Sequence, residues 1–102
     1  SGGGQTKCLK YIPEGVRIIK DNLFEPPVIF DIIRKASKAP AREMYQVFNM
    51  GCRLEIYTTG EAAEAIIQTA ARFGVDARII GRVEPGAKKE LIIHTSEGEL
   101  RY

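Results

Sequence analysis

Apolar positions recur with a two-residue period in some parts of this chain and with a helical period in others, which predicts a mixture of strands and helices. The β-branched stretch at 16–20 predicts a first strand. Isoleucines spaced three and four residues apart behind a Pro-Pro pair predict a helix over 28–35. Pro40 opens a second predicted helix, which runs over 41–48. The residues expected to share the core-facing side of that helix are Met44, Val47 and Phe48.

The second half of the chain predicts four further strands. Residues 52–58 alternate apolar and polar side chains, which is the period of a half-buried strand. A strand over 77–83 leads through a Pro-Gly turn to a strand over 90–95. A Ser-Glu-Gly reversal then leads into a short last strand over 99–102.

One long helix is predicted over 61–73, between two of these strands. Thr58 stands three residues before Glu61, the spacing of a capping box, and Gly74 follows the last helical position as a stop signal. Acidic residues in the first turn and a basic residue in the last turn suit the helix dipole. The positions expected along one face are Ala62, Ile66, Ala70 and Phe73.

These elements predict an α+β domain in which helices pack on a mixed, largely antiparallel sheet. The tight reversals near the C-terminus require antiparallel pairing, whereas the strand–helix–strand passage over 52–83 can form a parallel crossover. No repeat or linker divides the chain, so residues 1–102 are expected to form a single domain.

The composition is that of an ordinary globular domain and argues against several classes of function. Of the 102 residues, 44% are hydrophobic and 27% are charged, which argues against a disordered chain. The net charge is +2 and no run of Lys and Arg exceeds two residues, so no nucleic-acid partner is expected. No apolar stretch approaches the length that spans a bilayer, so no membrane partner is expected either. The cysteine usage fits a reducing compartment, and we expect a cytoplasmic protein.

The residues that usually carry chemistry are few and scattered. Cys8, Cys52 and His94 form no paired motif, so no metal site is expected, and Cys52 is most simply a small buried apolar residue. The chain has no G-x-S-x-G elbow, and the Gly-Ala-Lys-Lys stretch at 86–89 joins two strands instead of opening a helix. The residues alone therefore nominate no catalytic group.

A run of glycines at the start of the chain admits two interpretations. Ser1, Gly2, Gly3 and Gly4 precede residues 5–10, which could begin a helix. The run is either the remnant of an expression linker, without function, or a loop whose main-chain N–H groups bind a phosphate at a helix N-terminus.

A second candidate is the connection at 48–51, between the second predicted helix and the strand after it. Asn49 tolerates left-handed backbone geometry, and Gly51 permits a positive φ or the close approach of another main chain. One interpretation is a tight connection with an Asn cap. The other is that Asn49 presents its amide to a site at the start of the strand, and the residues alone favour neither.

Residues 43–51, EMYQVFNMG, closely resemble the EMYR-x-FNMG signature of the phosphoribosylformylglycinamidine cyclo-ligases, also called aminoimidazole ribonucleotide synthetases. Residues 1–4 resemble the TGGG loop of that family, with Ser1 in place of Thr. The later segments that match in the same order are 11–15 (YIPEG), 26–30 (PPVIF) and 80–83 (IGRV). Together the matches extend over nearly all of the chain.

The resemblance implies that this chain is most of the C-terminal domain of a two-domain enzyme. That family converts formylglycinamidine ribonucleotide and ATP to aminoimidazole ribonucleotide, ADP and phosphate, and its N-terminal domain supplies the acidic residues that bind ATP and Mg²⁺. The resemblance favours a native loop over a linker at Gly2, Gly3 and Gly4, and implies that this loop binds the ribonucleotide phosphate. The residues expected to line the same interdomain cleft are Ser1, Asn49 and Gly51.

Two alternatives to this interpretation remain open. One is a free-standing α+β module that binds a ligand or mediates oligomerisation. The other is half of a related selenophosphate- or thiamine-phosphate-kinase-type enzyme, which the FNMG stretch disfavours. Without an ATP domain the chain is expected to be inactive, and apolar surface left uncovered on it leads us to expect a homo-oligomer.

Overall fold

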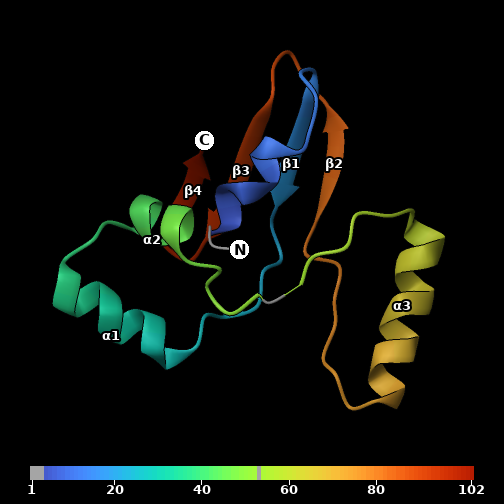
Figure 1. Ribbon diagram of the computed structural model, residues 1–102, viewed down its shortest axis with the longest axis horizontal. Helices are drawn as coiled ribbons and strands as arrows, with labels where there is room; N and C mark the ends of the chain where they lie inside the picture. The colour runs from blue at the N-terminus through green and yellow to red at the C-terminus, as the bar shows by residue number, and fades with distance from the viewer. Residues whose placement is uncertain (1–3, 53) are drawn as a thin grey trace.

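The structure is a computed structural model that describes residues 4–52 and 54–102. Within these residues it has a four-stranded sheet, three α-helices and one 3₁₀ helix (Figure 1). In chain order the elements are η1 (Gln5–Lys10), β1 (Val16–Lys20), α1 (Val28–Ser37), α2 (Ala41–Val47), α3 (Gly60–Arg72), β2 (Gly81–Pro85), β3 (Glu90–Thr95) and β4 (Gly98–Arg101). The α+β class predicted from the sequence is confirmed.

The sheet is mixed and largely antiparallel, as predicted. Its strand order is β2-β1-β3-β4, with a parallel pair, β1 and β3, at the centre and an antiparallel partner at each edge. The parallel crossover runs from β1 to β3 and includes all three α-helices, because parallel neighbours need a long connection. It is not the crossover expected over 52–83.

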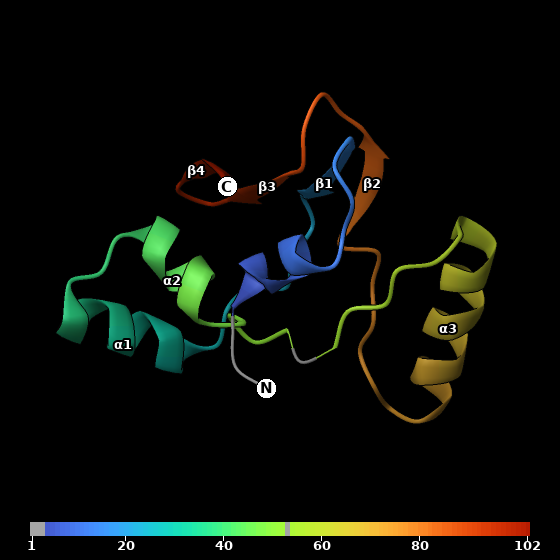
Figure 2. The ribbon, with the colours of Figure 1, turned by 45° about the horizontal axis from the view of Figure 1, so that its top comes forward.

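The core lies on the face of the sheet that η1 covers, with α2 beside it (Figure 2). Ile18, Leu91 and Ile93 from the two central strands form its buried centre, and apolar side chains of η1 pack against them. Met44 of α2 is buried as predicted, whereas Val47 is exposed. A helix of two turns thus contributes only part of the face that its sequence pattern predicts.

The opposite face of the sheet carries a chain of alternating charges above Ile19 and Ile92, which are both buried. Arg17 lies at its centre and pairs with Glu84 at 2.6 Å and with Glu90 at 3.5 Å. The ion-paired neighbours across the four strands are, in order, Asp21, Arg82, Glu84, Arg17, Glu90, Arg101 and Glu99. His94 lies next in the row, with its Nε2 3.6 Å from Oε2 of Glu99. The hydrogen bonds from Arg17 hold the pKa of Glu84 below its ordinary value. This is the pattern of a sheet face that is in contact with water.

The strand predicted over 52–58 is wrong, since none of its described residues lies in a strand. The alternation of polar and apolar side chains is present, but the faces are reversed. Glu55 reaches the buried Lys20, with its Oε2 2.8 Å from Nζ, while Leu54 and Ile56 are 77% and 55% exposed. A buried ammonium group must be paired, and that requirement outweighs the apolar pattern here.

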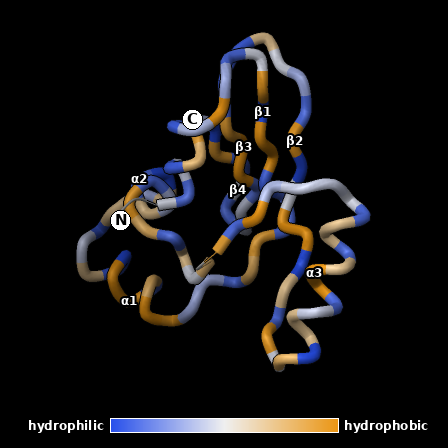
Figure 3. Tube along the Cα trace, turned by 45° about the vertical axis from the view of Figure 1, so that its right-hand side comes forward, coloured by the Kyte–Doolittle hydropathy of each residue, from blue (hydrophilic) through white to orange (hydrophobic). Residues whose placement is uncertain are grey.

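The helix α3 forms almost where it was predicted but stands away from the sheet, and no residue of it is buried (Figures 1 and 3). Figure 3 shows hydrophobic positions along α3 and α1 as well as along the central strands. The cap is Thr59, not Thr58, because the helix begins at Gly60 and the Thr59 hydroxyl accepts from the N–H of Ala62 at 3.3 Å. Gly74 ends the helix as predicted, with a φ of 72°.

The strand β2 begins at Gly81, four residues later than the strand predicted over 77–83. The preceding residues are bound to the loop after β1, since the Asn22 side chain donates to the main-chain oxygen of Ile79 at 2.8 Å. A Cβ at Gly81 would lie 1.9 Å from the main-chain oxygen of Ile19. Gly81 therefore permits the close approach of β2 to β1 at the point where their pairing begins.

Candidate functional site

The structure brings the start of η1 and the bend at residues 49–51 together. The helix η1 begins directly after Gly4, and the bend follows α2, which packs beside η1. The Gln5 side chain connects the two, because its Nε2 donates to the main-chain oxygen of Asn49 over 2.7 Å. The hydroxyl of Thr6 adds a longer contact of 3.4 Å to the main-chain oxygen of Gln46.

Gly4 packs so closely against α2 that a side chain has no room. A Cβ at this position would lie 2.6 Å from the main-chain oxygen of Tyr45 and 2.7 Å from that of Gln46. The φ of Gly4 is −92°, which every residue adopts, so the contact and not the backbone conformation requires glycine. Gly4 therefore has a packing role that is independent of any ligand. The other residues of the predicted loop, which lie outside the described part of the chain, are Ser1, Gly2 and Gly3.

The bend after α2 is a tight turn built around Asn49. Its side-chain Oδ1 accepts from the N–H of Gly51 at 2.8 Å, and its main-chain oxygen accepts from the N–H of Cys52 at 3.1 Å. Met50 and Gly51 have φ values of 55° and 95°. A Cβ at Gly51 would also lie 2.5 Å from Cδ of Pro27. The geometry accounts for both predicted residues as parts of a tight connection, while Asn49 itself stays exposed.

Sequence reasoning missed Lys20, whose side chain is only 2% exposed. Its Nζ donates to the main-chain oxygen of Gln5 at 3.0 Å, to Oε1 of Gln5 at 2.6 Å and to Oε2 of Glu55 at 2.8 Å. Three acceptors satisfy the three protons of the ammonium group. The sequence did contain a signal for the burial of Lys20. Lys20 lies two residues after Ile18 on β1, so both side chains lie on the core face of the sheet.

The thiol of Cys52 and the phenol of Tyr57, which lie near Glu55, are held in their neutral forms. Burial, with a further contribution from Glu55, raises the pKa of the Cys52 thiol. Tyr57 is half-buried, and this partial burial is the main cause that raises its pKa, with Cys8 and Glu55 acting in the same direction. The Tyr57 hydroxyl donates to Oε1 of Glu55 at 3.1 Å. A thiol with a raised pKa is a poor nucleophile near neutral pH, and both cysteines are free and partly buried.

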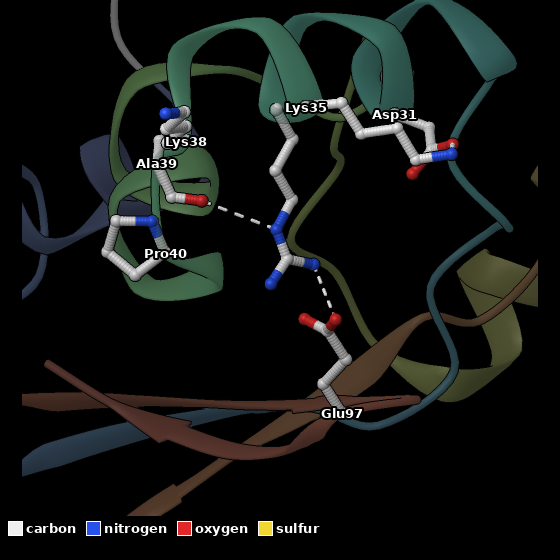
Figure 4. Close-up of a pocket in the computed structure, with 7 residues that line it drawn as sticks. Asp31, Lys35, Lys38, Ala39, Pro40 and Glu97 are labelled. Carbon is white, nitrogen blue, oxygen red and sulfur yellow. Dashed lines mark hydrogen bonds and ion pairs between the residues drawn. The ribbon is translucent and has the colours of Figure 1, made fainter.

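A cavity of about 540 Å³ lies between α1, the start of α2 and the turn from β3 to β4 (Figure 4). Arg34 donates from Nε to the main-chain oxygen of Ala39 at 3.3 Å and from Nη1 to Glu97 at 2.5 Å. Lys35 pairs with Asp31 at 3.0 Å. These four side chains form two ion pairs in the wall of the cavity, which Lys38 also lines. Asn49, Gly51 and Gly4 do not line it.

The part of the chain that the structure describes has neither a cluster of metal ligands nor a helix that could span a membrane. No group of three or more His, Cys, Asp or Glu side chains is placed there to hold a metal ion. The described residues therefore offer no site for Mg²⁺, which the resemblance assigns to an N-terminal domain. Across 4–52 and 54–102, no helix is both long enough and apolar enough to cross a membrane.

The fold and the contact between η1 and the bend at 49–51 together define the class of this domain. It is an α+β domain with a mixed four-stranded sheet, in which an N-terminal 3₁₀ helix and the bend after α2 meet over one face. Residues 1–94 match the model of the family described as AIR synthase related protein, C-terminal domain. The chain belongs to this family.

Curated relatives named phosphoribosylformylglycinamidine cyclo-ligase are similar to the chain over most of its length. The protein of Methanopyrus kandleri is 35% identical over 99 residues, which are 97% of this chain and 28% of that protein. The protein of Pseudothermotoga lettingae is 35% identical over 94 residues, 90% of this chain and 28% of its own length. The protein of Methanocaldococcus jannaschii is 36% identical over 81 residues, which are 79% of this chain and 23% of that protein. The chain thus spans about a quarter of the length of these relatives.

Proposed function

We propose that this chain is the substrate-binding C-terminal domain of an ATP-dependent cyclo-ligase of de novo purine biosynthesis. The reaction converts formylglycinamidine ribonucleotide and ATP to aminoimidazole ribonucleotide, ADP and phosphate. The observation that carries the proposal is the similarity to three cyclo-ligases at about one-third identity over 79–97% of this chain. The family match over residues 1–94 supports it.

In this proposal the main-chain N–H groups of Gly2, Gly3 and Gly4 bind the phosphate of the ribonucleotide. The family match includes the glycine run, which supports a native loop over a linker. Amide donors that are oriented before the anion arrives lose little freedom on binding. The bond from Gln5 to Asn49 supports a single site, because it holds the bend next to the residues that follow the glycines. Ser1, on the loop, is proposed to line the cleft to the ATP domain with the bend residues.

The remaining parts of the enzyme are also proposals. ATP and Mg²⁺ would be bound mainly by an N-terminal domain, which is the expected partner of this chain. A homo-oligomer is supported by exposed apolar side chains such as Leu54 and Phe73, which are 77% and 79% exposed. A cytoplasmic location is supported by two cysteines that are both free.

A calorimetric titration tests the proposal directly. The chain is titrated with formylglycinamidine ribonucleotide, alone and together with the separately expressed ATP domain, and ring closure is measured in both samples. We expect binding of the ribonucleotide, and turnover only when the ATP domain is present. Ring closure by this chain without a partner, or no ribonucleotide binding in either sample, would contradict the proposal.

The phosphate role of the glycine run has a separate test in the complete enzyme. Gly3→Asp introduces an anionic side chain where the phosphate is proposed to bind, so ribonucleotide affinity should fall much more than stability. Gly60→Asp is the matched control, since a Cβ at Gly60 has no neighbour within 4 Å and an acidic residue suits a helix N-terminus. Equal ribonucleotide affinity in the two variants would exclude the phosphate role.

A further inference from the structure

We propose that Lys20 and Gln5 are positioning residues, which hold the start of η1, directly after Gly4, and the bend at Asn49 at the separation that the ribonucleotide requires. This inference rests on the proposed function and adds two residues that the sequence motifs do not mark. Neither side chain needs to touch the substrate. They act through the main-chain segments that they connect.

The connection is a continuous series of hydrogen bonds. Glu55 Oε2 accepts from Lys20 Nζ at 2.8 Å, and the same Nζ donates to Gln5 Oε1 at 2.6 Å. Gln5 Nε2 then donates to the main-chain oxygen of Asn49 at 2.7 Å. Lys20 also donates to the main-chain oxygen of Gln5 at 3.0 Å, which fixes the first residue of η1 directly after Gly4. The start of η1 and the bend are therefore both attached to the central strand β1.

The chemistry of Gln5 makes this connection specific. An amide between an ammonium donor and a carbonyl acceptor must present its oxygen to the first and its NH₂ to the second. Gln5 is 3% exposed, so neither end of its amide has water as a ready alternative partner. A glutamate of the same shape would still accept from Lys20 but would place a carboxylate oxygen against the oxygen of Asn49.

Stability alone is a weak explanation for this arrangement. Lysine is rarely buried to this extent, and replacing a buried ion pair by apolar residues of similar volume often leaves a protein equally or more stable. The neighbours of Lys20 on the core face, Ile18 and Ile93, show that an apolar side chain suits this environment. A charged connection, in contrast to an apolar contact, fixes the direction as well as the distance of its partners.

The test compares three variants of the full-length enzyme. Lys20→Met removes the centre of the series, and Gln5→Glu removes only its last bond. Lys35→Met is the matched control for the loss of a lysine, because Lys35 is exposed and, among residues 4–52 and 54–102, pairs only with Asp31 on its own helix. For each variant the KM for formylglycinamidine ribonucleotide, the KM for ATP, kcat and the thermal midpoint of unfolding are measured.

We expect the KM for the ribonucleotide to rise about tenfold to hundredfold in Lys20→Met and Gln5→Glu, since small displacements of binding groups have effects of this size. The KM for ATP should stay within about twofold in every variant, and Lys35→Met should match the parent protein. If both variants lower the thermal midpoint and leave the ribonucleotide KM unchanged, the two residues are structural only and the inference is wrong. If Lys20→Met does not fold, Gln5→Glu decides alone. A parent enzyme that neither binds nor closes the ribonucleotide contradicts the proposed function itself, which is a different result.

Discussion

Gln5 and Asn49 are separated by 44 positions in the chain and joined by a hydrogen bond of 2.7 Å. The residues next to this bond are two glycines, Gly4 before η1 and Gly51 in the bend, and each is pressed against another part of the main chain or a proline ring. Close packing at both ends and one amide between them therefore determine how η1 and the bend are placed.

The contact between Gly4 and α2 predicts a cost for even one methyl group. In Gly4→Ala the new Cβ would overlap the main-chain oxygens of Tyr45 and Gln46, so the free energy of unfolding should fall by about 1–3 kcal/mol. Gly60→Ala is the control, because it adds the same group where no atom lies within 4 Å and should cost nothing measurable. Urea denaturation of both variants gives the comparison. Equal stability of the two variants would show that η1 does not pack on α2 in this way.

Gly51 combines a positive φ with a close neighbour, and a second glycine separates these two effects. Gly74 has a φ of 72° with no atom within 4 Å of a Cβ, so Gly74→Ala should cost only the backbone strain, about 1–2 kcal/mol. Gly51→Ala adds the overlap with Pro27, and we expect its cost to exceed that of Gly74→Ala by about 1–3 kcal/mol. Chemical denaturation measures the difference. A smaller loss for Gly51→Ala than for Gly74→Ala would contradict the contact between the bend and the segment before α1.

The central strands and the helices were predictable because their periods are clear and their ends are marked. The strand Val16–Lys20, the helix that begins at Val28 and the hairpin of β3 and β4 all follow apolar runs bounded by turn residues. The stretch over 52–58 has an equally clear alternation, but its described residues form no strand, because Glu55 pairs with the buried ammonium group of Lys20. Periodicity shows which residues share a face, but it does not show which face is buried.

The candidate site was predictable only where a motif marked it. The resemblance selected the glycine run and the bend, and the structure places Gly4 and Asn49 in neighbouring segments. Lys20 and Gln5 went unnoticed because each is ordinary in its local sequence, and only the strand register brings the lysine under η1. Polar groups of this kind are recognised by their burial, which is a tertiary property.

The N-terminus of α3 provides a test of which threonine caps the helix. Thr59→Ala should remove the acceptor for the N–H of Ala62 and lower stability or helicity by the equivalent of about 0.5–2 kcal/mol. Thr58→Ala is the matched control and should have little effect, because the helix begins at Gly60. Far-ultraviolet circular dichroism and thermal unfolding follow both variants. The reverse order of effects would restore the capping box that the sequence predicts.

We expect Tyr57 to contribute to the loss of stability at alkaline pH. Its pKa in the folded protein lies above the ordinary value of about 10, because partial burial of a residue that is still 50% exposed, together with the neighbours Cys8 and Glu55, disfavours the phenolate. The unfolded state therefore loses this proton first as pH rises. The contribution of Tyr57 to stability is complete below pH of about 10 and is lost as pH rises from there through the higher folded pKa.

Tyr57→Phe removes the ionisation together with the hydrogen bond to Glu55, so it should be slightly less stable at pH 7 and less sensitive to alkali than the parent protein. Tyr11→Phe, at a side chain that is 76% exposed, serves as the control and should keep the full alkaline loss. Urea denaturation midpoints at a series of pH values, with phenolate absorbance recorded at the same time, measure both effects. If the midpoint falls with pH to the same extent in Tyr57→Phe and in the parent protein, another group causes the alkaline loss of stability.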